Sequence, residues 1–108
     1  MNKEIREILK DQIKTAKAMA DAEILKNPSD DGTCNFDRCL FKKENKWTYQ
    51  EMIDLFKECG LDCSKHSPGW LSVDELRGQA DKNTRWHKTF KYWMEEQGFE
   101  CSMYYQMD

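Results

Sequence analysis

The chain has 108 residues, of which 39% are hydrophobic, 34% charged and 12% aromatic, so we predict one folded domain, residues 1–108, rather than a disordered chain. Its 17 basic and 20 acidic residues are interspersed, and the net charge of −3 argues against general nucleic-acid binding. The first residues form no apolar leader, no segment approaches the ~20 apolar residues of a membrane span, and the five cysteines are an odd number, so a cytoplasmic protein with reduced thiols and no membrane contact is expected.

The first predicted element is an amphipathic helix over residues 2–27. Apolar residues recur there at spacings of three and four, from Ile5 to Ile24, and Pro28 ends the pattern. A helix packed on the core is the favoured interpretation. The alternative is a dimerisation or partner-binding helix, because the apolar stripe is narrow and rich in alanine.

The middle of the chain predicts a strand, a helix and a second short strand. Residues 34–41 read as the first strand. The helix begins at Thr48, which forms a capping box with Glu51, and ends at Gly60. Residues 62–69 are interpreted as a loop, and residues 70–73 as a strand, with a helical turn as the alternative.

A third helix is predicted from about residue 80 to 97, followed by the most regular strand pattern of the chain. Apolar and polar residues alternate strictly from Phe99 to Asp108, which indicates a strand with one buried face. The resulting order α-β-α-β-α-β predicts an α/β fold with a small, three-stranded, mostly parallel sheet covered by helices.

The cysteines and histidines are the candidates for a metal site or a catalytic site. Cys34, Cys39, Cys59, Cys63 and His66 could ligate zinc in a structural module, but their spacing is loose, so no metal and no cofactor is predicted. His66 and His87 lie outside any catalytic motif. The absence of phosphate-binding loops and catalytic signatures in the sequence favours a non-catalytic protein.

Three groups of polar residues remain as a candidate ligand site. Asn35 and Asp37 share one face of the first predicted strand, and Tyr104 and Gln106 share the polar face of the last. Gln79, Asn83 and Arg85 lie at the start of the third predicted helix, where free amides and a guanidinium attract anions. Parallel strands would bring these groups together at one sheet edge. The simpler alternative is that they cap helices and satisfy one another.

The same stretches carry a resemblance. Residues 32–37 (GTCNFD), 78–85 (GQADKNTR) and 104–108 (YYQMD) resemble a group of small uncharacterised proteins that bacteriophages and mobile elements of gut bacteria carry. The resemblance covers about residues 32–108. It implies a setting, the bacterial host cell, and the kind of role that small phage accessory proteins often have, which is the inhibition of host defence.

The expected function is therefore a non-catalytic binding protein that counteracts a host defence. Its partner would be a small signalling nucleotide that it sequesters or a host defence protein that it masks, and a homodimer is possible because a small domain with four tryptophans has apolar surface to bury. A small nuclease or nucleotide hydrolase and a structural zinc module are the alternatives.

Overall fold

The computed structural model describes residues 1–27, 36–77 and 80–106. The elements, in chain order, are α1 (Lys3–Lys26), β1 (Arg38–Lys42), α2 (Tyr49–Glu58), β2 (Cys63–Ser67), β3 (Trp70–Val73), α3 (Ala80–Glu96) and β4 (Cys101–Tyr104). All three predicted helices are confirmed, as are the strands near residues 70–73 and 101–104. The described part of the first predicted strand begins later than expected, and β2 was predicted to be a loop.

The four strands form one sheet in the order β2-β3-β1-β4, and every neighbouring pair is antiparallel. The prediction of a three-stranded, mostly parallel sheet with alternating helices and strands is therefore wrong. β2 and β3 form a hairpin whose turn contains Gly69 with φ +85°. The sequence pattern hid this hairpin because β2 reads Cys-Ser-Lys-His-Ser, which has no apolar face.

The connections of the strands are interleaved. β1 and β2 are joined through α2 but are separated in the sheet by β3, and β3 and β4 are joined through α3 but are separated by β1. Two such interleaved βαβ units make the ferredoxin-like arrangement, here preceded by α1. This arrangement supports many unrelated functions, so function has to be argued from the side chains.

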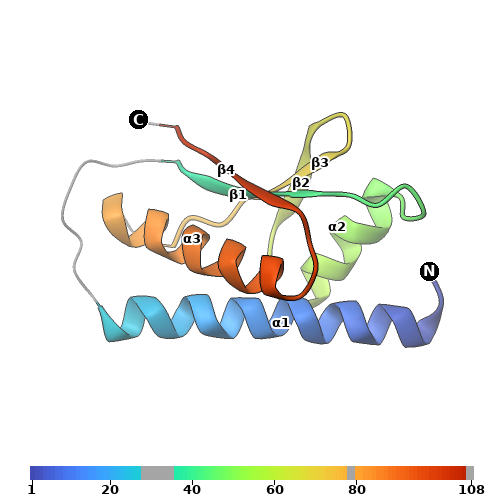
Figure 1. Cartoon of the computed structure of the whole chain (residues 1–108), viewed down its shortest axis with the longest axis horizontal. Coiled ribbons are helices and arrows are strands. Elements are labelled where there is room, and N and C mark those ends of the chain that lie inside the picture. The colour runs from blue at the N-terminus through green and yellow to red at the C-terminus, as the bar shows by residue number, and fades with distance from the viewer. Residues whose placement is uncertain (28–35, 78–79, 107–108) are drawn as a thin grey trace.

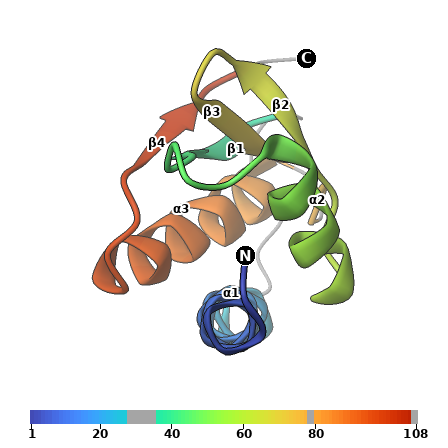
Figure 2. The same ribbon diagram turned by 90° about the vertical axis from the view of Figure 1, so that its right-hand side faces the viewer.

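The molecule has three layers (Figures 1 and 2). α2 and α3 cover one face of the sheet, and α1 lies across these two helices on the side away from the sheet. No helix of the described residues covers the opposite face of the sheet. The core lies between the sheet and the helices, and its largest fully buried side chains include Phe41, Phe56, Trp86 and Phe90.

α1 packs on the core as the favoured interpretation predicted. Ile13, Ala16 and Ala20 are fully buried, because small residues at this spacing let α1 approach α3 closely. Polar contacts also connect the two helices, since the indole of Trp86 donates to Asp21 at 2.8 Å. No helix among the described residues combines the length and the apolar character that crossing a membrane requires.

Helix boundaries follow the local sequence signals. Thr48 and Glu51 form the predicted capping box of α2, with both reciprocal hydrogen bonds at 3.0 Å. α3 ends where Gly98 adopts φ +97° and the N–H of Phe99 donates back to the carbonyl of Met94, the pairing of a Schellman motif. This turn directs Phe99 and β4 back toward the sheet.

Candidate functional site

Part of the predicted ligand site does come together where β1 begins. The carboxylate of Asp37 accepts hydrogen bonds from the hydroxyl of Thr84 at 2.8 Å and from the backbone N–H of Gln106 at 2.9 Å. Asp37 is only 6% exposed. The predicted partners Asn35 and Gln79 lie outside the described residues.

Asn83 is fully buried in the same cluster. Its amide nitrogen donates to the carbonyl oxygen of Asp37 at 3.1 Å, and its amide oxygen accepts from the backbone N–H of Arg77 at 3.1 Å. The side chain thus connects the first turn of α3 to β1 and to the segment after β3. These contacts are those of the alternative interpretation, in which the polar groups satisfy one another.

Two other predicted residues point elsewhere. Arg85 lies 3.0 Å from the carboxylate of Asp81 and 4.0 Å from that of Glu23 on α1, so it faces the helix layer. The ring of Tyr104 lies on the uncovered face of the sheet, with its centroid 5.0 Å from that of His66. The structure therefore distributes the predicted site over three places. Ligand binding by these residues stays a prediction.

His87 is a second buried polar group at this end of the sheet. The backbone N–H of Cys39 donates to its Nδ1 at 3.0 Å, which requires the proton of the neutral ring to be on Nε2, and Nε2 lies 2.7 Å from the carbonyl oxygen of Glu75. Burial is the main cause that lowers the pKa of His87 to about 4. The neutral ring therefore joins β1, α3 and the segment after β3.

Three of the described cysteines, Cys39, Cys59 and Cys63, sit in environments that raise the pKa of the thiol. A hydrogen bond with the thiol of Cys101 and burial raise the pKa of Cys39 well above its usual range, and burial raises the pKa of Cys59 and of Cys63. A thiol held in its protonated form is a poor nucleophile and a poor metal ligand. Within residues 1–27, 36–77 and 80–106, no three His, Cys, Asp or Glu side chains gather as a metal site requires.

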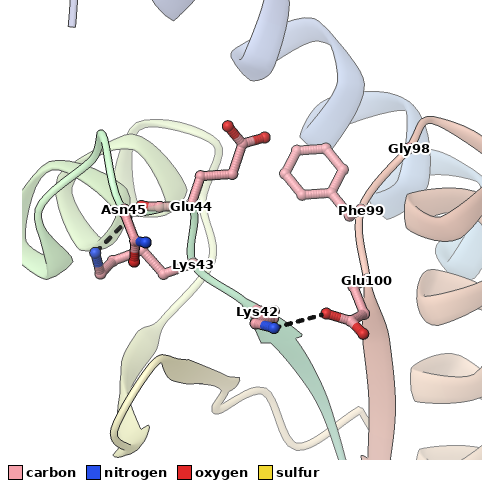
Figure 3. A pocket seen from close by; sticks show the side chains of 7 residues that line it. All are labelled: Lys42, Lys43, Glu44, Asn45, Gly98, Phe99 and Glu100. Carbon is pink, nitrogen blue, oxygen red and sulfur yellow. Dashed lines mark hydrogen bonds and ion pairs between the residues drawn. The ribbon is translucent and has the colours of Figure 1, made fainter.

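A concave surface lies at the other end of β1, where the β1–α2 loop faces the α3–β4 turn. A cavity of about 300 Å³ is lined by residues 42–45 and 98–100. Lys42 at the end of β1 and Glu100 directly before β4 have their charged groups 3.4 Å apart. Figure 3 shows Phe99 and Glu44 projecting to the same side from the two walls of this cavity.

A second cavity of about 290 Å³ adjoins the first, because both are lined by Glu44, Gly98 and Phe99. It extends under the N-terminal half of α1, and its apolar lining residues are Ile5, Ile8, Leu9, Trp47 and Phe99. We call the two cavities together the Phe99 cleft. Ile8 is 58% exposed there, although exposed isoleucines are costly in water.

Lysines and glutamates surround the apolar part of the Phe99 cleft. Lys46 lies 3.2 Å from Glu44, and its ammonium lies 4.9 Å from the ring centroid of Trp47. The ammonium of Lys43 donates to the backbone carbonyl of Trp47 at 2.6 Å. These contacts hold the β1–α2 loop in a defined shape, so the cleft has a preformed wall.

The Phe99 cleft was not predicted from the sequence. Ile8 belongs to the apolar stripe of the first predicted helix and Phe99 to the alternation of the last strand, so both were assigned to the core. At this end α1 extends beyond α3, and its ion pair between Arg6 and Glu58 holds it against α2. The side of the stripe that α3 does not reach therefore faces the cavity. The sequence signal for the cleft was the length of the apolar stripe in α1, which is longer than α3, the helix against which it packs.

Comparison of the chain with protein families, with curated proteins and with solved structures gave no match.

Proposed function

We propose that this chain is a non-catalytic binding protein of a phage or mobile element, which acts in the bacterial host cell and counteracts a host defence by masking a defence protein. The setting is supported by the resemblance in residues 32–37, 78–85 and 104–108. The binding surface is supported by the Phe99 cleft, in which the exposed Ile8 and the half-buried Phe99 are surrounded by charged side chains.

The chemistry of the cleft favours a protein partner over a small nucleotide. Nucleotide phosphates need several converging donors, whereas Lys42 and Lys46 are already paired with Glu100 and Glu44. An apolar anchor side chain of a partner protein would cover Ile8 and Phe99, and the surrounding charged side chains would form the polar rim that surrounds such anchors.

The proposal is tested by capture from phage-infected bacteria with three immobilised forms of the full chain. Ile8→Glu places a charge in the cleft, and Leu25→Glu is the matched control, because Leu25 is an exposed apolar residue of the same helix that does not line the cleft. Mass spectrometry identifies the captured proteins and small molecules. We expect one host protein with the unmodified chain and with Leu25→Glu, and its loss with Ile8→Glu.

Two outcomes contradict the proposal. Equal capture by all three forms would show that the cleft is not the binding surface. Recovery of a small nucleotide with no host protein would favour sequestration, and recovery of that nucleotide in a hydrolysed form would favour the alternative of a small hydrolase. Thermal melting of Ile8→Glu serves as the folding control, because an exposed position tolerates the change.

A further inference from the structure

The sheet has two edges, and they differ in how they are protected against pairing with another strand. β2 has an irregularity in its register between Lys65 and Ser67, and Lys65 adds a charge. Bulges and lysines are the usual devices that keep an edge strand from pairing. β4 pairs with β1 in an unbroken register, and residues 101–106 carry no charge.

The backbone of β4 offers hydrogen-bonding groups away from β1. Lys42 donates to the carbonyl of Glu100 and Phe36 donates to that of Gln106, so the even-numbered residues of this segment face β1. In an antiparallel ladder the alternate residues face the other way. The N–H and C=O groups of Cys101, Met103 and Tyr105 therefore point to the outer side of β4, where the sheet continues with no other described strand (Figures 1 and 2).

Tyrosine side chains flank this open edge. Tyr104 is 39% exposed and Tyr105 is 61% exposed. The ammonium of Lys88 lies 5.8 Å from the ring centroid of Tyr105, and Tyr92, 55% exposed, follows four residues later on the same face of α3. Tyrosines with an exposed apolar ring are enriched at protein interfaces.

We infer that a second copy of this chain pairs with the open edge, β4 against β4 in antiparallel orientation, to make a continuous eight-stranded sheet. With the two-fold axis at Met103, Tyr104 lies opposite Ser102 of the other copy and Tyr105 lies opposite Cys101. Each of the two tyrosines then meets a small side chain, Met103 meets its own equivalent, and the outward backbone groups of Cys101, Met103 and Tyr105 are paired.

The segment 101–106 is complementary to itself, which favours a second copy of this chain as the partner of β4. A two-fold interface brings each residue near its own equivalent, so a charged edge strand would repel itself. Residues 101–106 carry no charge, and the small Cys101 and Ser102 precede Met103 whereas the large Tyr104 and Tyr105 follow it. An antiparallel copy of the same segment therefore sets these small side chains opposite the large ones. The outward-facing residues of β4 on which the dimer rests, Cys101, Met103 and Tyr105, do not line the Phe99 cleft, and the inference does not depend on the proposed function.

The test introduces charges at the two exposed side chains of β4, Ser102 and Tyr104. Ser102→Lys with Tyr104→Lys sets lysines opposite each other across the dimer, and Ser102→Glu with Tyr104→Glu does the same with glutamates. Light scattering at high micromolar concentration should give twice the chain mass for the unmodified protein and the chain mass for each double variant. An equimolar mixture of the two variants should recover the dimer, because opposite charges then face each other.

A matched control lies on the other edge. Ser64→Lys adds a charge at an exposed position of β2 and should leave the dimer intact. A monomeric unmodified protein would overturn the inference, whatever the variants do. A dimer that survives both double variants, or one that Ser64→Lys disrupts equally, would also overturn it, since the copies would then meet on another surface.

Discussion

The two ends of β1 use their side chains in opposite ways. At the Asp37 end, polar groups are buried and paired: Asp37, Asn83 and His87 are each less than a tenth exposed and make hydrogen bonds between elements. At the other end, in the Phe99 cleft, apolar groups are exposed, as Ile8 shows. Figure 1 places the first end near the C-terminus and the second near the N-terminus.

The difference separates a structural role from a binding role. A buried polar group that is paired contributes to stability, and its removal leaves its partners without hydrogen bonds. An exposed apolar group contributes little to folding, and one that lines a cavity is open to contact with another molecule. The predictions below test whether mutations at the two ends have these opposite effects.

The largest effect is expected from Asn83→Ala at the Asp37 end. The change leaves the backbone N–H of Arg77 and the carbonyl of Asp37 without the partners that they have at 3.1 Å. Because each unpaired buried group costs about 1–3 kcal/mol, we expect the free energy of unfolding to fall by about 4 kcal/mol. Urea denaturation measures it. A loss below about 1 kcal/mol would mean that this end is not held by its polar network.

The second effect is a dependence of stability on pH that comes from His87. Its pKa is lowered to about 4 in the folded protein from an ordinary value of 6.5. Below pH 6.5 the unfolded chain therefore binds a proton that the folded protein does not bind. Stability should fall between pH 6.5 and about pH 4 by at most about 3 kcal/mol, and this contribution is complete above pH 6.5.

His87→Gln is the control for this pH dependence, because glutamine does not titrate. Comparing the two unfolding curves at each pH removes the contribution of the carboxylates, which both proteins share. The variant should show a shallower decline of stability between pH 6.5 and pH 4. If the two declines are parallel, the folded protein binds the proton at His87, and the hydrogen bond from Cys39 to Nδ1 is not maintained.

Features that depend on a few neighbouring residues could be predicted from the sequence, and features that depend on strand pairing could not. α2 was predicted correctly because Thr48, Glu51 and Gly60 act locally, within a few residues of the helix ends. β2 could not be predicted, because an exposed edge strand needs no alternation of apolar and polar residues. Its residues Lys65 and His66 are polar, as residues of a loop usually are. Without β2 the hairpin disappears, and the remaining order of elements favours parallel strands.

The arrangement of the candidate site could be predicted only in part, for a related reason. Asp37, Asn83 and Gln106 meet as expected, but residue types alone do not tell a pair that binds a ligand from a pair that binds each other. Whether Ile8 and Phe99 are covered depends on how far α1 extends past α3, which is a property of packing. Sequence periodicity reports which residues share a helix face and not what lies against that face.

A smaller effect is expected from Arg85→Ala. The guanidinium connects α3 to α1 through Glu23 and also pairs with Asp81. Its side chain is 20% exposed and that of Asp81 is 54% exposed, so solvent weakens these ion pairs. We expect a loss of about 1 kcal/mol, measured by urea denaturation. Unchanged stability together with lost partner binding would assign Arg85 to a ligand site and would move the binding surface away from the Phe99 cleft.

The smallest effect on stability is expected from Ile8→Ser in the Phe99 cleft. Because Ile8 is 58% exposed, the change removes little buried apolar surface, and the free energy of unfolding should change by less than about 0.5 kcal/mol. Calorimetry on Ile8→Ser and on Ile13→Ser gives the comparison, since Ile13 is a fully buried residue of the same helix and its replacement should cost several times more. If Ile8→Ser destabilises the protein as much as Ile13→Ser, then the isoleucine supports the fold, and the cleft loses the exposed apolar anchor on which the binding proposal rests.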